Sequence, residues 1–339
     1  MIILLKKYQL FTLFMFLLCA MKVTAQPKVE VLTQGTKTSL RGLSVVDDRV
    51  VWVSGSRGTV GRSLDGGASF TWIKVQGYDS VDFRDIEAFS STDAIIMGVA
   101  DPAYILKTVN GGETWRKVYE NRDSGMFLDA MEFWSLESGI VIGDPVKGRF
   151  FIARTFDEGN TWKELPFEKR PLADSGEACF ASSGTNIRAM DRDEACFVSG
   201  GLNSRLFSKK AAITLPLGTR KETTGANSVA VSKKKKCIII AGGDFMAPDS
   251  VQHNCIISKD EGKTWRRPAV PPHGYRSCVE FISKTKVVSC GINGVDYSTD
   301  EGNTWQWIGR EGFHVCRKAK KGNAVFFAGS NGRVGKLVL

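Results

Sequence analysis

The sequence predicts an all-β fold, a seven-bladed β-propeller of four-stranded blades that is closed by the N-terminal strand. Three observations lead to this fold class. An eight-residue box recurs through the chain, the flanking residues form short β-branched and aromatic runs divided by Gly, Asp and Pro, and no long segment after residue 25 has helical periodicity.

The box reads Ser or Thr, any residue, Asp or Asn, any residue, Gly, any residue, Ser or Thr, then an aromatic residue. Its copies begin at residues 63, 108, 155, 258 and 298. The wide gap between the third and fourth copies leaves room for a unit at 204–217 that has lost its box, and a partial unit at 329–339 ends the chain. Seven units of this length, each made of short strands, predict a propeller.

One unit shows the expected strand order. Residues 86–89 predict an innermost strand, followed by strands at 94–98, 104–108 and 114–120. The last unit lacks its fourth strand, whereas residues 28–34 (KVEVLTQ) predict a strand without a unit of its own. Pairing that strand with the last blade would close the ring and remove its open edges, which makes residues 26–339 a single domain.

The box falls at the turn between the third and fourth strands of a blade, and its chemistry indicates a structural role. The Asp or Asn can accept backbone N–H bonds, and the Gly can take a positive φ. The residues at this acidic position are Asp65, Asn110, Asp157, Asp260 and Asp300. Each box offers only one or two carboxylates, which is too few for a calcium site, so no metal is expected.

The first 25 residues predict a signal peptide. Lys6 and Lys7 precede a short apolar run, and small residues lead to a cleavage site after Ala25. We therefore expect an exported protein, periplasmic or secreted. The remaining chain has 43 basic and 36 acidic residues, a net charge of +7, without an aromatic-basic nucleic-acid signature or a second apolar span. We expect no nucleic-acid partner, no membrane span in the mature chain, and a monomer.

Seven cysteines remain after the predicted cleavage: Cys179, Cys196, Cys237, Cys255, Cys278, Cys290 and Cys316. The odd number leaves at least one of them unpaired. Burial as small apolar residues in strands is the favoured interpretation. Cys278 and Cys290, which flank one predicted hairpin symmetrically, are the best candidates for a disulfide.

Polar residues precede the innermost strand of every unit. These strand starts should surround the channel mouth on the face opposite the boxes, and they are Arg41, Arg84, Asp129, Glu177, Asn227, Arg276 and His314. Structural hydrogen bonding and ligand binding are equally favoured for them. The long loop at 242–254, which carries Asp244, Asp249 and His253, should rise on the same face.

The boxes resemble the Asp-box, or BNR, repeat. The segments FRDIEAF, FLDAMEFWSLESGIVIGDPVKGRFFIARTFDEGNTW, GEACFASSGTNI, GYRSCVEF and GINGVDYSTDEGNTW are similar to propellers related to photosystem II assembly and stability factors, in particular to a bacterial branch often labelled oxidoreductase. The resemblance implies a seven-bladed propeller that binds a protein or a ligand on one face. An arginine patch holds a client in the photosynthetic relatives, and Arg41, Arg84 and Arg276 are the counterparts it implies here.

Two function classes follow from this resemblance. The preferred one is a non-enzymatic binding or assembly module for a protein client or an anionic ligand, without a cofactor. No Gly-x-Gly-x-x-Gly opens a helix, so the residues give the oxidoreductase label no support. The alternative is a sialidase-like glycosidase, in which the three arginines bind a carboxylate and the catalytic residues are Asp129, Glu177 and Tyr275.

Overall fold

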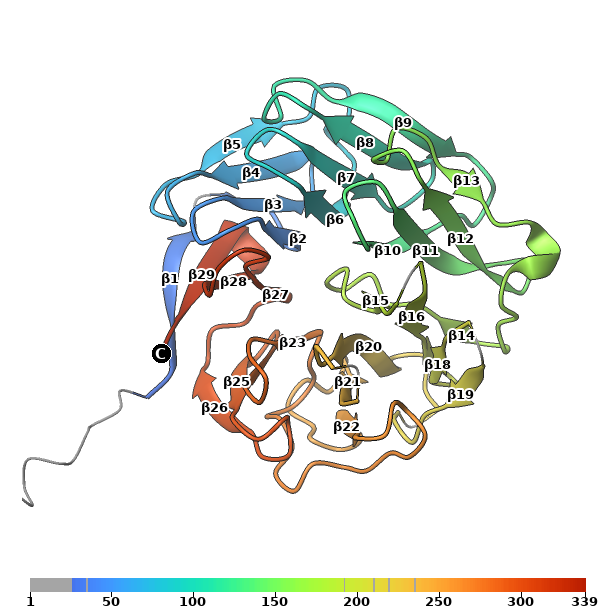
Figure 1. The fold of residues 1–339 in the computed structure, drawn as a ribbon, viewed down its shortest axis with the longest axis vertical. Helices are drawn as coiled ribbons and strands as arrows, with labels where there is room; N and C mark the ends of the chain where they lie inside the picture. Colours follow the sequence, from blue (N-terminus) through green and yellow to red (C-terminus); the bar gives the residue numbers. More distant parts are fainter. Residues whose placement is uncertain (1–25, 35, 192, 210, 219, 235) are drawn as a thin grey trace, which may run out of the picture.

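The computed structural model describes residues 26–339 except residues 35, 192, 210, 219 and 235. Its strands form seven antiparallel sheets arranged around a central channel, as predicted (Figure 1). No α-helix occurs among the described residues, and none of their helices is long and apolar enough to cross a membrane. The predicted signal peptide, residues 1–25, lies outside the described residues.

The four strand positions of each blade follow in order from the channel to the outer edge. The innermost strands are β2 (Leu40–Val45), β6 (Phe83–Ala88), β10 (Leu128–Phe133), β15 (Ile187–Ala189), β20 (Thr224–Val231), β23 (Cys278–Phe281) and β27 (Val315–Lys318). The second strands are β3 (Val51–Gly55), β7 (Ala94–Gly98), β11 (Gly139–Val146), β16 (Ala195–Val198), β21 (Ile238–Asp244), β24 (Val287–Gly291) and β28 (Val325–Ala328).

The third strands are β4 (Thr59–Ser63), β8 (Ala103–Thr108), β12 (Arg149–Thr155), β18 (Arg205–Phe207), β22 (Cys255–Ser258), β25 (Gly294–Ser298) and β29 (Arg333–Val338). The outermost strands are β5 (Thr71–Lys74), β9 (Arg116–Asn121), β13 (Lys163–Glu164), β19 (Ala212–Thr214), β26 (Gln306–Gly309) and β1 (Lys28–Gln34). In blade five a single bridge between Ile257 and Arg266 takes this outer place. Two short 3-10 helices, η1 (Phe167–Lys169) and η2 (Ser330–Gly332), lie in loops.

The N-terminal strand closes the ring. β1 pairs antiparallel with β29, from Lys28 opposite Val338 to Gln34 opposite Arg333. The seventh blade therefore consists of three strands from the C-terminus and one from the N-terminus (Figure 1). This arrangement confirms the predicted closure, and it covers an edge of β29 that would otherwise lack partners.

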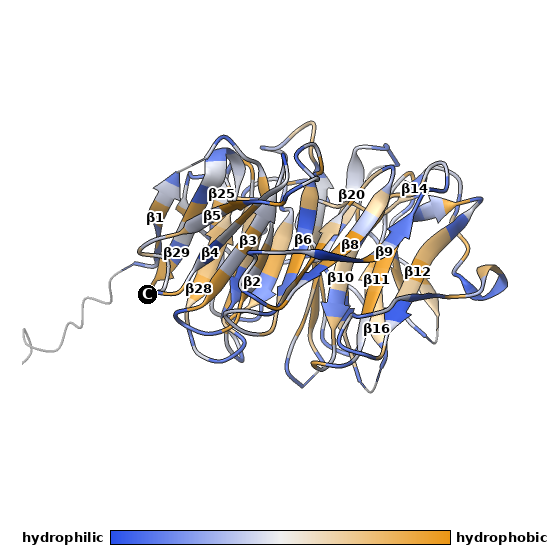
Figure 2. Ribbon diagram, turned by 90° about the horizontal axis from the view of Figure 1, so that it is seen from above, coloured by the Kyte–Doolittle hydropathy of each residue, from blue (hydrophilic) through white to orange (hydrophobic). Residues whose placement is uncertain are grey.

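Apolar side chains of neighbouring blades fill the space between the sheets. Figure 2 shows hydrophobic residues along the strands and mostly hydrophilic residues in the loops of both faces. The core includes Trp52, Phe83, Phe150 and Phe326, which are fully buried. Alternation along each strand explains this pattern, because the two faces of a blade pack against different neighbours.

The five boxes form turns with equivalent hydrogen bonds, except that in blade two the Asn110 side-chain amide donates to the Thr114 hydroxyl (2.9 Å) where an Asp accepts in the other boxes. In the last copy, Asp300 accepts bonds from the Thr304 backbone N–H (2.9 Å), the Thr304 hydroxyl (2.8 Å) and the Ser298 hydroxyl (2.8 Å). Gly302 has φ +80°, as the sequence predicts, and a Cβ there would meet Ile239 of the preceding blade at 2.8 Å. Each box turn is therefore a structural joint between neighbouring blades. We call the face that carries these turns the box face, and the opposite one the loop face.

Candidate functional site

Four of the predicted mouth residues occupy β-bulges on innermost strands. The strand register skips one residue in blades one, two, three and five, at Arg41, Arg84, Asp129 and Asn227. A bulge residue makes no ladder pair and changes the direction of its side chain. The repeated bulge is the local reason that these polar residues share one position near the loop face.

Blade four departs from this pattern. The sequence predicts its innermost strand at EACFAS, but only Glu177–Ala178 (β14) is a strand there, and it pairs with Gly200–Gly201 (β17). The innermost strand resumes at β15, and residues 179–186 leave the sheet between these two parts. We call residues 179–186 the plug loop.

The plug loop contacts six other blades. Ser182 accepts a bond at its carbonyl from Arg41 (3.2 Å), Ser183 donates to the Ser277 carbonyl (2.7 Å), and Gly184 accepts from Arg317 (2.9 Å). The remaining contacts are the Cys179 N–H to Asp144 (2.8 Å), the Val229 N–H to the Thr185 carbonyl (2.9 Å), and Gly184 against Asp85. Ser183 and Asn186 are fully buried. The loop thus crosses the channel and separates the loop-face mouth from the box-face mouth.

Arg41 and Arg84 lie near each other at the loop-face mouth. Burial lowers the pKa of Arg41, and the charge of Arg84 lowers it further. The Arg84 Nε donates to Asp82 (2.8 Å) and its guanidinium lies 5.6 Å from the Phe127 ring centroid. The Arg84 side chain keeps 28% of its surface exposed, so it is the predicted arginine best placed to meet a partner.

Arg276, the third predicted arginine, is fully buried. Its Nε donates to Asp296 (2.6 Å), and its Nη1 donates to the Tyr275 carbonyl (2.8 Å) and to Asn293 (2.6 Å). These bonds join β23, β25 and the connecting loop of one blade. Because no part of the guanidinium reaches solvent, Arg276 stabilises blade six and does not belong to an exposed arginine patch.

Three further predicted site residues are buried and form hydrogen bonds within the protein: Tyr275, Asn227 and His314. The Tyr275 hydroxyl donates to Asn227 (2.8 Å), and burial raises the pKa of this tyrosine to about 12. His314 Nε2 lies 3.0 Å from the Ser330 hydroxyl, and burial together with Arg41 and Arg84 lowers the pKa of His314 to about 3. His314 is therefore neutral, and Tyr275 keeps its proton near neutral pH.

The two predicted acids, Asp129 and Glu177, are not exposed at the mouth. Asp129 is fully buried, and burial and the neighbouring Asp144 raise its pKa well above the ordinary range. Glu177 is bound by Arg205 (Nε to Oε1, 2.8 Å), by the Ser199 hydroxyl and by the Asp174 backbone N–H (2.8 Å). Neither carboxylate is therefore available to a ligand at the surface.

The loop face also carries an exposed apolar area. Phe245 and Met246, in the long blade-five loop, are 37% and 72% exposed. The Phe245 ring packs edge-on against Phe180 of the plug loop (5.8 Å between centroids) and near Tyr275 (6.4 Å). Other exposed apolar residues in loops of this face are Leu202, Val251 and Ile292. In the sequence, the apolar pair in the loop motif FMAP (residues 245–248) is the signal for this area.

The polar residues of the same loop shape it. Asp244 accepts a bond from the Met246 N–H (2.9 Å), and Asp249 accepts one from the Asn293 side chain (2.8 Å). His253 Nδ1 lies 2.8 Å from Arg267, and burial and this arginine lower its pKa. These contacts hold Phe245 and Met246 at the surface.

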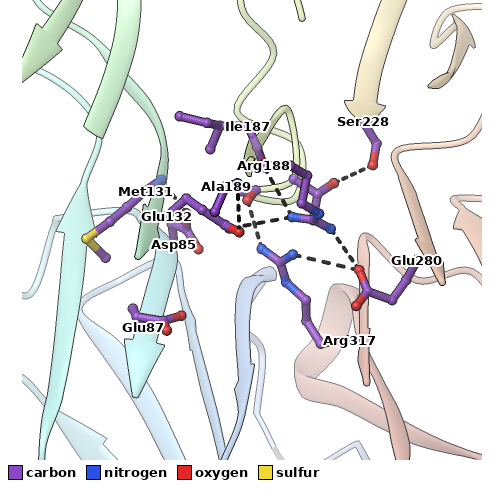
Figure 3. Close-up of polar contacts among 12 residues, drawn as sticks. Asp85, Glu87, Met131, Glu132, Ile187, Arg188, Ala189, Ser228, Glu280 and Arg317 are labelled. Atoms are coloured by element: carbon purple, nitrogen blue, oxygen red, sulfur yellow. Dashed lines mark hydrogen bonds and ion pairs between the residues drawn. The ribbon is translucent and has the colours of Figure 1, made fainter. Parts of the chain in front are cut away.

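A cavity of about 590 Å³ opens on the box face, opposite the predicted mouth residues. Charged residues from one equivalent position of five innermost strands line it: Glu87, Glu132, Arg188, Glu280 and Arg317. Arg188 donates to Glu280 (2.8 Å) and lies 3.7 Å from Glu132, whereas Arg317 lies 4.0 Å from Glu280 (Figure 3). In the sequence, these five charged residues stand at the second position of the recurrent motifs IEAF, MEFW, IRAM, VEFI and CRKA.

No family model matches the sequence, and no curated protein matches it. Solved structures do match, at the level of the fold. YCF48 bound to D1 peptide superposes with a TM-score of 0.66 at 16% identity, covering 94% of this chain and 96% of that one. YCF48 from Cyanidioschyzon merolae gives 0.65 at 16%, covering 91% and 98%. The WD40 β-propeller domain of Doa1 gives 0.61 at 14%, covering 93% and 97%.

Proposed function

We propose that this propeller is an exported, monomeric, non-enzymatic module that binds a protein client on its loop face. The observation that carries the proposal is the exposed Phe245–Met246 area on the same face as Arg84, over a channel that the plug loop crosses. Aromatic residues, Met and Arg are enriched where protein interfaces bury their centres. A surface of this composition suits a polypeptide better than a small substrate.

The charges at this surface favour a client with an acidic group. Arg41 and Arg84 add positive potential to one side of the mouth, while Asp129 and Glu177 are buried and bring no exposed negative side. A guanidinium forms its best contacts with carboxylates and phosphates. The proposed client segment therefore places an apolar side chain on Phe245 and Met246 and an acidic group at Arg84. The fold shared with YCF48 bound to D1 peptide is compatible with such a role.

The residues considered for the glycosidase alternative are not accessible to a substrate. It needs an accessible carboxyl pair, but Asp129 is fully buried and Glu177 is occupied by Arg205. Tyr275, its expected nucleophile, is hydrogen bonded to Asn227 and buried. Burial and the neighbouring Asp144 raise the pKa of Asp129, but neither residue lines the 590 Å³ cavity.

Site-specific photo-crosslinking tests the proposal. A photoreactive residue at Met246 should capture a client in the cells that make the protein, whereas the same residue at Phe156 should not. Phe156 is a matched control, since it is 59% exposed and lies in a box turn on the opposite face. A client captured equally at both positions, or at neither, would contradict the proposal.

Binding of the purified client then tests the residues. Met246→Ser and Phe245→Ala should each weaken binding by at least tenfold, and Phe156→Ser should leave it unchanged. Arg84→Ala should raise Kd by roughly 10- to 100-fold if the contact is charge-assisted, about 1.5–3 kcal/mol. Wild-type affinity in the Met246→Ser and Arg84→Ala variants would remove the proposed site.

The box-face cavity supports a second candidate function, the binding of a small anionic ligand. Its charged lining includes Lys318, Lys320 and Lys321 besides the five residues above, so basic groups exceed acidic ones. A thermal-shift screen with dicarboxylates and sugar phosphates tests this function. A rise in Tm that disappears in a Lys318→Ala, Lys321→Ala variant would favour it, and no rise for any of these anions would exclude the tested classes.

A further inference from the structure

Three buried cysteines lie together between blades six and seven. Cys278 (β23) faces Cys290 (β24) in the strand register, and Cys316 comes from β27 of the next blade. Their Sγ atoms all lie within 4.8 Å of one another, and all three side chains have no exposed surface. All seven described cysteines are free thiols, so the disulfide considered for Cys278 and Cys290 is absent.

The three sulfurs form a compact group. The Sγ atoms of Cys316 and Cys278 are 3.5 Å apart, and the Cys316 backbone N–H donates to the Cys278 Sγ (3.3 Å). The cluster therefore offers three closely spaced sulfur ligands from two blades.

We propose that Cys278, Cys290 and Cys316 form a three-sulfur binding site for a Cu(I) ion. Soft thiolate ligands select soft metals, of which Cu(I) accepts three sulfur ligands. The surrounding core, which includes Phe313, Val295 and Leu40, is apolar and would keep water from the ion. This site is independent of the proposed client-binding surface.

Zinc fits the cluster less well. Structural zinc sites have four ligands in tetrahedral geometry, and no fourth His, Cys, Asp or Glu joins the group in the described part of the chain. Hard ions such as Ca²⁺ and Mg²⁺ require oxygen ligands, which the cluster does not provide. The number and softness of the ligands thus favour Cu(I).

A Cu(I) ion at this position would connect three strands of two blades. Blade seven is the blade that the N-terminal strand completes, so the ion would brace the ring next to its closure. Binding replaces thiol protons, and because the ion binds only the folded chain it adds to the stability of the fold. The expected consequence is a higher Tm for the Cu(I) form than for the reduced, metal-free form.

Anaerobic titration of the reduced mature protein with Cu(I), in competition with a chromogenic Cu(I) chelator, tests the proposal. The wild-type protein should take up one Cu(I) per chain and show thiolate-to-copper charge-transfer absorption. Cys278→Ser, Cys290→Ser and Cys316→Ser should each lower the affinity by more than about 100-fold, the upper end of the loss seen for partners outside the coordination sphere. Cys255→Ser is the matched control, because Cys255 is also buried but lies outside the cluster.

X-ray absorption at the copper edge should report three sulfur ligands, and circular dichroism should show that each variant is folded. Cys→Ala variants replace any Cys→Ser variant that fails to fold. Two results would overturn the proposal: uptake of no Cu(I) by the reduced wild-type protein, or equal affinity in the wild-type and Cys278 variants.

Discussion

The guanidinium of Arg41 reaches from blade one to the plug loop of blade four, where its Nη1 donates a 3.2 Å hydrogen bond to the carbonyl oxygen of Ser182. This bond spans the channel and joins residues 141 positions apart in the sequence. A residue expected to bind a ligand therefore also holds the segment that closes the channel. Stability measurements can separate the two roles.

Arg41→Ala should destabilise the protein by about 1.5–3 kcal/mol, because the Ser182 carbonyl loses a charged donor in a partly buried place. Urea unfolding measures this loss, and hydrogen exchange should show faster exchange at residues 181–185. Arg41→Lys, which keeps a charged donor, should lose less. Unchanged exchange in Arg41→Ala would show that the plug loop does not depend on this bond.

Gly184→Ala should be more destabilising than an alanine at another left-handed glycine. Gly184 has φ +61°, and a Cβ there would lie 2.4 Å from the Asp85 carboxyl group. Gly125 is the control, since it has φ +81° and no atom within 4 Å of its Cβ position. Gly125→Ala should cost about 1 kcal/mol, and Gly184→Ala roughly 1–3 kcal/mol more. Equal losses in thermal unfolding would contradict the close contact.

Asp85 should make the protein less stable as pH rises. Burial raises its pKa to about 8, against the opposing effects of Arg317 and of the Met131 and Ile86 backbone N–H groups. Since the unfolded pKa is about 3.9, the folded chain binds this proton more tightly. The contribution is complete below about pH 4 and is lost as pH rises toward 8, by up to about 1.4 kcal/mol per pH unit.

The comparison of Asp85→Asn with the wild-type protein isolates this effect. Other buried acids titrate in both proteins, so the difference between their unfolding free energies reports Asp85. The wild-type protein should lose stability relative to the variant between pH 5 and pH 8. A difference that is constant across this range would show that Asp85 is not protonated in the folded state.

Deleting residues 27–34 should destabilise the whole ring. β1 covers the edge of β29, and Val29, Val31 and Leu32 pack against the core between blades. Loss of this apolar contact should cost roughly 3 kcal/mol or more. Calorimetry should show a lower Tm, and a chain with Gly and Ser in place of these residues should behave like the deletion. A deletion protein that melts like the mature chain would refute the role of β1 in closure.

Asp300→Ala should cost about 1–2 kcal/mol, because the Thr304 N–H and two hydroxyl groups lose their acceptor. Asp300→Asn should recover most of this loss, since Asn110 makes the equivalent contacts in blade two. Client binding should not change in either variant. Selective loss of binding in a folded Asp300→Ala protein would place the functional surface on the box face instead.

The blade plan follows from the sequence alone, because the interactions that define it are local. In a box turn, Asp300 bonds residues two positions before and four positions after it, so its chemistry is visible in eight consecutive letters. The unpaired strand at 28–34 predicted the closure for a similar reason, since a sheet edge requires a partner. The equivalent positions of Arg41, Arg84, Asp129 and Asn227 also followed from the repeat.

Which of these side chains are exposed to a partner depends on the packing of the whole ring. Arg84 and Arg276 look alike before their strands, yet Arg84 keeps 28% exposure whereas Arg276 is enclosed by Asp296 from another strand. The apolar letters of the plug loop wrongly predicted a strand, because the path of this loop depends on contacts with the six other blades. The Cys278–Cys316 approach likewise joins two blades. Burial and electrostatic pairing depend on residues that are distant in sequence. A repeat can therefore predict the strand position of a residue, but not the burial or the partners of its side chain.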